Sequence, residues 1–253
     1  MTRRFLSYAK FNVYLAVLGR RADGYHELDT LLQALSLADT LTFTATEGTR
    51  IEVSCDDPRV PADGDNLVGR ALALLRERHG VRRGMRVQIA KRIPPQAGLG
   101  GGSGNAACAL AAANLIWRLD LPEEALERLA AEIGSDAAFF IRGGAQRGRG
   151  RGERLAPTEA LPDSRWIVVK PPWGLETGLV YRGLRAVLTP PQERIRMVLE
   201  QVAKRDPASV ARSMFNDLES AARGVKPEVG EVRAWMADQG LDGAVLAGSG
   251  SAW

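Results

Sequence analysis

Residues 97–107 read AGLGGGSGNAA and carry five glycines between Gly98 and Gly104. Glycine loses more backbone entropy on folding than any other residue, so such a cluster indicates a need for bare backbone. The alternating stretch 85–93 before it predicts a strand, and the alanine-rich stretch 105–119 after it predicts a helix. The first N–H groups of a helix lack partners within the helix, and the helix dipole adds positive charge there. The order of strand, glycine loop and helix therefore predicts phosphate binding, with a structural turn or a linker as alternatives.

Two common phosphate loops fit this stretch poorly. A Walker A loop ends in Gly-Lys-Ser/Thr, and no lysine lies between Gly98 and Gly104. A Rossmann loop needs a third glycine where this chain has Ser103. Asp120 lies about 20 residues farther on, where a ribose-binding acid would lie. An NAD-dependent oxidoreductase therefore stays open as an alternative.

The composition is that of an ordinary globular protein. The 253 residues carry a net charge of +4, which is too small to indicate nucleic-acid binding by itself. Cys55 and Cys108 form no CxxC pair or disulfide framework, so we expect a cytoplasmic protein. The longest uncharged stretch, 93–117, has only about 13 residues that look helical, too few to span a bilayer. The Arg/Gly segment 142–154 resembles RNA-binding tails, but its brevity favours a glycine-rich strand or hairpin with exposed arginines.

The rest of the chain predicts a mixture of strands and helices. A proline-containing stretch, 156–165, suggests a domain boundary and hence domains at 1–157 and 158–253, the second incomplete at its end. Ser135 could cap a short helix that starts at Asp136. The other expected elements are two short strands within 5–18, strands at 40–46, 50–55, 166–170 and 244–247, and helices at 66–78, 122–134, 192–204 and 229–239.

The pattern Pro94-x-x-x-Gly98-Leu99-Gly100-x-x-Ser103 resembles the ATP loop of the GHMP kinase superfamily. Three further segments, AKFN at 9–12, RRADGYHEL at 20–28 and SDAAFF at 135–140, narrow the resemblance. They are similar to the kinases that phosphorylate the 2-hydroxyl of 4-diphosphocytidyl-2-C-methyl-D-erythritol in the non-mevalonate isoprenoid pathway. The Gly-Tyr-His element is the specific signal, and another GHMP small-molecule kinase is the alternative. The resemblance implies an α+β, two-domain GHMP kinase fold.

The resemblance also implies a set of site residues. Phosphoryl transfer to a hydroxyl requires phosphates held in line, developing charge neutralised and a proton removed. The implied catalytic residues are Lys10 and Asp136. The implied ATP-binding residues are Asn66, Lys91, Pro94, Gly98, Leu99, Gly100, Gly101, Gly102 and Ser103. The implied substrate-binding residues are Asn12, Tyr25, His26, Asp136, Thr177 and Tyr181.

The cofactors implied are ATP and Mg²⁺, the latter with unknown ligands. The expected partner is the small-molecule substrate, without nucleic acid or membrane, for a monomer or homodimer. Three residues depart from the family pattern: Gly104 replaces a second loop serine, and Ala137-Ala138 replace the Val-Pro that usually follows the catalytic acid.

Overall fold

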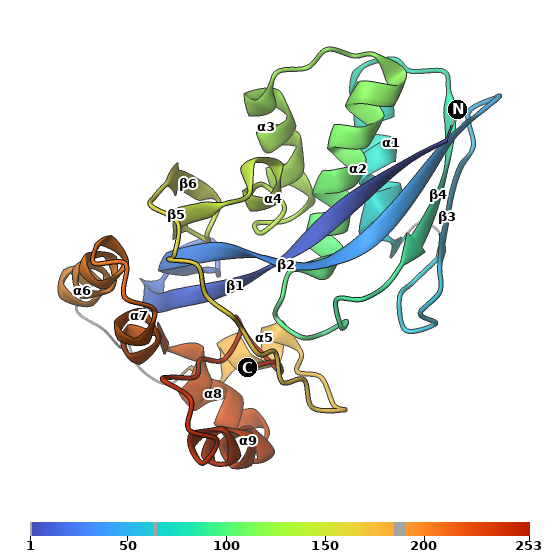
Figure 1. Cartoon of the computed structure of the whole chain (residues 1–253). Coiled ribbons are helices and arrows are strands. Elements are labelled where there is room, and N and C mark those ends of the chain that lie inside the picture. The colour runs from blue at the N-terminus through green and yellow to red at the C-terminus, as the bar shows by residue number, and fades with distance from the viewer. Residues whose placement is uncertain (1, 63–64, 185–190) are drawn as a thin grey trace. The chain divides into compact units, whose positions relative to one another are not determined.

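A computed structural model describes residues 2–62, 65–184 and 191–253, with the side chains of 191–193 excepted. Its helices and strands are shown in Figure 1. In chain order they are β1 (Thr2–Arg20), β2 (His26–Thr46), β3 (Ile51–Cys55), α1 (Leu67–Arg78), β4 (Gly84–Ala90), α2 (Gly101–Trp117), α3 (Glu123–Ile133), α4 (Phe139–Arg142), β5 (Ala145–Gly150), β6 (Arg154–Pro157), α5 (Thr177–Arg182), α6 (Pro191–Ala203), α7 (Pro207–Ser213), β7 (Phe215–Asn216), α8 (Leu218–Val225) and α9 (Glu228–Ala237).

The chain divides into two compact units whose segments alternate along the sequence. Unit 1 comprises residues 1–9, 35–95 and 100–143, and unit 2 comprises residues 10–34, 96–99 and 144–253. The long strands β1 and β2 each contribute one part to each unit. The assignment of domains to 1–157 and 158–253 stays a prediction.

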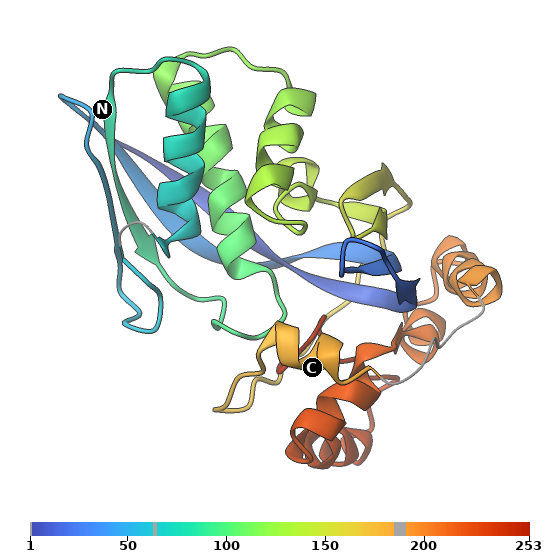
Figure 2. The same ribbon diagram turned by 180° about the vertical axis from the view of Figure 1, so that it is seen from behind.

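Unit 1 is a layer of strands covered by helices. The second half of β2 pairs antiparallel with β4 from Thr40 to Thr46, and β4 pairs parallel with β3. Helices α1, α2 and α3 lie on the same side of these strands (Figures 1 and 2). The small side chains of α2 are buried between neighbours, which explains why this helix is rich in alanine. Phe43, Leu72 and Leu110 are fully buried in this unit.

Unit 2 contains the hairpin expected in the Arg/Gly segment. Strand β5 pairs antiparallel with β2 over Leu28–Gln33 and with β6. Strand β7 pairs parallel with β1 at Tyr14 and Leu15. A hydrophobic cluster joins β1 and β2 to α5, α8 and α9, with Leu28, Leu218 and Leu246 among its buried members.

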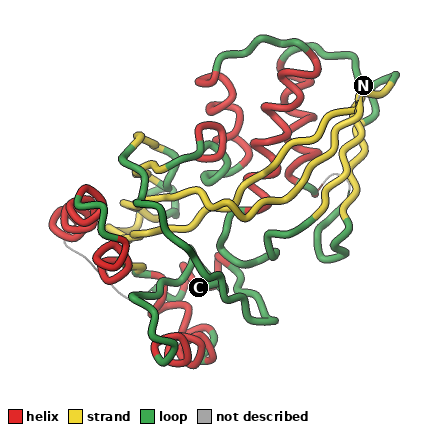
Figure 3. Tube along the Cα trace, in the orientation of Figure 1, coloured by secondary structure: helices red, strands yellow, loops and turns green. Residues whose placement is uncertain are grey.

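The structure corrects several predicted elements. Residues 2–20 form one strand, not two: burial alternates only up to Ala9, and the strand continues through Lys10 with residues 9–17 all buried. The stretches 166–170 and 244–247 are loop (Figure 3), since their backbone bonds are isolated ones such as the pair between Val169 and Trp253. Helix α2 begins four residues earlier than predicted, within the glycines. Asp136 lies in a turn, and the short helix begins only at Phe139.

Other expectations agree with the structure. The helices predicted at 66–78, 122–134, 192–204 and 229–239 correspond to α1, α3, α6 and α9. The strand expected at 50–55 pairs with β4 instead of its sequence neighbour β2. Among the described residues, no helix has the length and apolar character needed to cross a membrane.

Candidate active site

The glycine loop is held by main-chain contacts that need glycine at two positions. Gly98 and Gly100 have φ values of 77° and 71°, a region that favours glycine. A Cβ at Gly98 would collide with the carbonyl oxygen of Ala247. The N–H of Ala252 donates to the carbonyl of Ala97 at 3.1 Å. The first half of the loop is therefore held by close backbone packing.

Helix α2 starts at Gly101, at the end of this loop. The N–H of Gly104 makes the first helical hydrogen bond, to Gly100 at 2.8 Å. In the described part of the chain no side chain caps this helix, so its first N–H groups can serve an anion. A Cβ at Gly101 would lie 3.2 Å from the Lys91 ammonium nitrogen, which places that cation next to the helix start. A Cβ at Gly102 would contact only a methyl group of Leu67, at an ordinary van der Waals distance of 3.5 Å.

Asp39 organises the residues around that helix start. Its carboxylate is fully buried and forms an ion pair with Lys91, with 2.5 Å between Oδ2 and the ammonium nitrogen. The backbone N–H groups of Arg92 and Ile93 each donate to Oδ1 at 2.8 Å, and the Asn105 amide donates to Oδ2 at 3.0 Å. We call these five residues the Asp39 cluster. It ties β2, the segment before the loop, and α2 together.

The sequence did not single out Asp39 or Asn105. An acid within a strand otherwise rich in leucine and threonine was the available signal, since buried charges are normally paired. The partner, Lys91, is 52 residues away, and only the register of β2 against β4 brings the two together.

Asn66 has a structural role that the resemblance did not imply. Its side-chain oxygen accepts from the Val68 N–H at 2.9 Å and caps α1. Its amide nitrogen donates to the carbonyl of Pro61 at 2.6 Å. Pro94 is partly exposed, just before the loop. ATP binding by these two residues stays a prediction.

The departure at Gly104 has a structural counterpart. A Cβ there would point at β1, 3.0 Å from both the Ser7 hydroxyl and the Tyr8 carbonyl oxygen. The position is therefore filled by β1, in place of an extra hydroxyl. Asp136, in the same unit, is partly buried in the turn that follows α3. Ala137 and Ala138 behind it are buried.

In unit 2, Lys10 and Asn12 form a buried polar chain with Thr30. The Lys10 ammonium donates to Asn12 at 2.9 Å, and the Asn12 amide donates to the Thr30 hydroxyl at 2.8 Å. Thr30 in turn donates to the carbonyl of Tyr14 at 2.6 Å. A Cβ at Gly248 would lie 3.5 Å from both Lys10 and Asn12, so the 248–251 loop lies against them. The loop itself is held by the Asn216 amide, which donates to the carbonyls of Leu246 and Gly248 at 2.7 Å each.

The Gly-Tyr-His element lies at the start of β2, also in unit 2. The rings of His26 and Tyr181 are in contact, 5.2 Å between centroids and tilted by 30°. Burial, with the cation of Arg20 as a smaller cause, lowers the pKa of the His26 imidazole. Tyr25 instead is exposed and lies under the guanidinium of Arg151, at 4.7 Å. The neutral imidazole therefore predominates at pH 7, and Tyr181 provides its ring contact among the described residues.

Thr177 begins α5 in the same unit, and its hydroxyl forms a hydrogen bond of 2.8 Å with the Ser249 hydroxyl. The structure therefore brings together Lys10 with Asn12, His26 with Tyr181, and Lys91 with Gly101. Leu99 is buried, and its carbonyl accepts from the Lys10 N–H at 3.0 Å. Ser103 lies in the first turn of α2.

Comparison with known proteins identifies the family. Residues 66–144 match the GHMP kinases N terminal domain. A 4-diphosphocytidyl-2-C-methyl-D-erythritol kinase of Pelotomaculum thermopropionicum is 39% identical over 97% of this chain and 85% of its own length.

Two solved structures resemble the chain as well. A crystal structure of 4-(cytidine 5'-diphospho)-2C-methyl-D-erythritol kinase has a TM-score of 0.83 at 38% identity, covering 99% of this chain and 88% of that one. A homoserine kinase from Cytophaga hutchinsonii has a TM-score of 0.76 at 20% identity, over 99% of this chain and 83% of that one, and shares the fold. These findings support a kinase and not the alternative of an NAD-dependent oxidoreductase. The chain has the GHMP kinase fold and belongs to the family of 4-diphosphocytidyl-2-C-methyl-D-erythritol kinases.

Proposed function

We propose that this chain transfers the γ-phosphoryl group of ATP to the 2-hydroxyl of 4-diphosphocytidyl-2-C-methyl-D-erythritol. The observation that carries the choice of substrate is the ring contact between His26 and Tyr181 within the Gly-Tyr-His element. The family assignment supports ATP as the donor. A cytoplasmic location and a monomeric or dimeric state stay predictions from the sequence.

Recognition of the cytosine is assigned to His26. A neutral imidazole offers one donor and one acceptor, and a cytosine edge presents both kinds of group. Among the described residues, no hydrogen-bond partner engages the His26 nitrogens, so both remain for a ligand. Contact with Tyr181 restricts rotation of the imidazole, which orients these two groups. Tyr25, exposed beside them, offers a ring face for stacking.

The phosphoryl transfer is assigned to four features of the chain. The N–H groups at the start of α2 hold phosphate oxygens, and Lys91 lies beside them. Asp136 accepts the proton of the substrate hydroxyl, and Lys10 neutralises the charge that develops on the transferred group. The roles of Asp136 and Lys10 rest on the family resemblance of their segments.

Mg²⁺ is the expected metal of such a kinase. The described residues contain no group of three or more His, Cys, Asp or Glu side chains arranged to hold a metal ion. Mg²⁺ keeps several waters and is bound mainly through substrate phosphates with one or two protein carboxylates. When bound, the ion would neutralise phosphate charge.

The test is steady-state kinetics of His26→Ala, with KM measured for both substrates by coupled ADP release. Loss of the imidazole should raise KM for the cytidylated substrate by about tenfold or more and leave KM for ATP unchanged. Tyr181→Ala should act in the same direction, while Tyr181→Phe, which keeps the ring, should change KM little.

His79→Ala is the matched control, since His79 is the only other histidine and ends α1. It should leave both KM values as they are. A rise in KM for ATP in His26→Ala, or no change for the cytidylated substrate, would contradict the assignment.

A further inference from the structure

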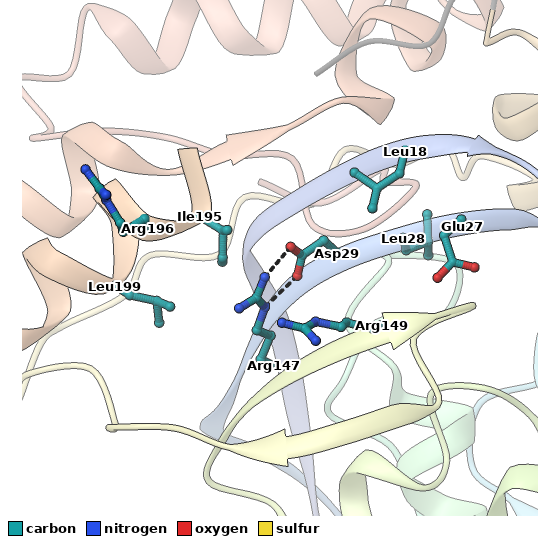
Figure 4. Close-up of a pocket in the computed structure, with 9 residues that line it drawn as sticks. All are labelled: Leu18, Glu27, Leu28, Asp29, Arg147, Arg149, Ile195, Arg196 and Leu199. Atoms are coloured by element: carbon teal, nitrogen blue, oxygen red, sulfur yellow. Dashed lines mark hydrogen bonds and ion pairs between the residues drawn. The ribbon is translucent and has the colours of Figure 1, made fainter. Parts of the chain in front are cut away.

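A hollow lies in unit 2, on residues that the proposed reaction does not use. It has a volume of about 450 Å³ and is formed by β1, β2, β5 and α6. This volume falls within the range of small-molecule sites. Figure 4 shows the arginines of β5 on one side of it and α6 on the other. None of its lining residues belongs to the glycine loop or to the His26–Tyr181 pair.

One arginine of this hollow is fixed in place by a buried carboxylate. Asp29, whose side chain is 4% exposed, binds Arg147 through two hydrogen bonds of 2.8 and 2.6 Å. These bonds use Nε and Nη2 of the guanidinium. Nη1 makes no hydrogen bond to any described residue, so its donors are left for a ligand. Arg147 is therefore a preorganised cationic donor.

The second arginine, Arg149, has no partner within the described part of the chain. Arg149 lies two residues farther along β5, on the same face of the strand. It makes no hydrogen bond or ion pair to any residue that the structure describes. Figure 4 shows both guanidinium groups turned into the hollow. Two cations on one face, of which Asp29 compensates only one, attract an anion.

The remaining walls are mostly apolar, apart from Glu27 and from Arg196 of α6, which forms an ion pair with Glu200 at 3.3 Å. Leu18 of β1 and Ile195 and Leu199 of α6 line the hollow. Glu27, the other acid there, is already bound by Arg21 and Arg154. A ligand that fits would therefore have a charged head at the arginines and an aliphatic body against the leucines and isoleucine.

We propose that this hollow binds a small organic anion with one phosphate or carboxylate head group and a short aliphatic body. No residue that lines the site belongs to the nucleotide loop or to the His26–Tyr181 pair, and Glu27 and Leu28 follow His26 directly in β2. Arg147 and Arg149 hold the head group, and α6 covers the aliphatic body.

Calorimetric titration with hexyl phosphate and with hexanoate tests the proposal. At least one of them should bind at a stoichiometry of one, also in the presence of saturating ADP, and the tighter one identifies the head group. Hexylammonium should not bind, and inorganic phosphate should bind more weakly because it has no aliphatic body. Absence of saturable binding of both anions, or its loss when ADP is present, would overturn the proposal.

Two variants locate the binding. Arg149→Gln should weaken it by about tenfold or more, since a charged hydrogen bond is lost. Leu199→Glu should weaken it similarly by placing a carboxylate beside the anion. The matched control is Arg83→Gln, an exposed arginine of unit 1 without a partner among the described residues. Unchanged binding in Arg149→Gln, with melting temperatures equal to that of the wild type, would also overturn the proposal.

Discussion

The Asp39 cluster and the His26–Tyr181 pair differ in how their polar groups are used. In the first, a fully buried carboxylate receives one ammonium, one amide and two backbone N–H groups. In the second, a partly buried imidazole is held by a ring contact, and its nitrogens have no partner among the described residues. The Asp39 carboxylate thus positions main chain and holds Lys91 beside the start of α2. The polar groups of His26, by contrast, remain for a ligand. Changes in the cluster should cost stability first, and changes in the pair should cost substrate affinity alone.

Asp39→Ala should have the largest effect. Removing the carboxylate leaves the buried Lys91 charge without its partner, which should lower the free energy of unfolding by about 3–5 kcal/mol. Urea unfolding measures this loss. Asp39→Asn should be milder, because the amide oxygen can still accept from the N–H groups of Arg92 and Ile93.

The control for Asp39 is Glu52→Gln in the same unit. Glu52 pairs with Arg86 at 2.8 Å on the surface, where ion pairs contribute little. Equal stability losses in Asp39→Ala and Glu52→Gln would mean that the Asp39 cluster does not hold the unit together.

Gly101→Val tests the start of α2 independently of the Asp39 cluster. Its Cβ would lie 3.0 Å from Ile93 and 3.2 Å from Lys91, and its methyl groups would crowd the first N–H groups of α2. We expect ATP affinity to fall by about tenfold or more. Calorimetric titration with a non-hydrolysable ATP analogue measures it. Retained affinity would show that the loop has a structural role only.

The pH dependence of substrate affinity sharpens the assignment of His26. Burial lowers the pKa of its imidazole below the ordinary 6.5, so the neutral form predominates at pH 7. Protonation would convert the accepting nitrogen into a donor. KM for the cytidylated substrate should therefore be constant from neutral pH upward and rise as the pH falls through this lowered pKa. His26→Ala should abolish that rise, and persistence of the rise would assign it to another group.

Gly104→Ser should have the smallest effect. The new side chain would point at β1, where the buried Ser7 hydroxyl has no hydrogen-bond partner among the described residues. The tight contact and the new hydrogen bond oppose each other, so stability should change by about 1 kcal/mol or less. kcat and KM for ATP should stay at wild-type values. A severalfold rise in kcat would indicate that the serine hydroxyl reaches the phosphates.

Local patterns were sufficient to predict much of the fold. The glycine loop, α1 with its Asn66 cap and α3 with its N-terminal glutamates follow from short-range rules of backbone entropy, capping and periodicity. The stretches 166–170 and 244–247 looked like strands because they are apolar. They are loops, since no neighbouring strand pairs along their length.

The site was predictable where its residues are adjacent in sequence. The loop glycines and the Tyr25-His26 element can be recognised because their residues are consecutive in the sequence. Asp39 and the Arg147–Asp29 pair depend on strand register over separations of 52 and 118 residues, which no local pattern contains. The register between strands that are distant in sequence is therefore the part of the site that could not be predicted.

The most direct test of the proposed function compares two alcohols as phosphoryl acceptors for the wild-type chain. Coupled ADP release should be measured with 4-diphosphocytidyl-2-C-methyl-D-erythritol and with 2-C-methyl-D-erythritol 4-phosphate, which lacks the cytidine. The chain should turn over the first and show little or no turnover of the second, because the His26 nitrogens would be left unpaired. Equal turnover of both alcohols would contradict the proposed function.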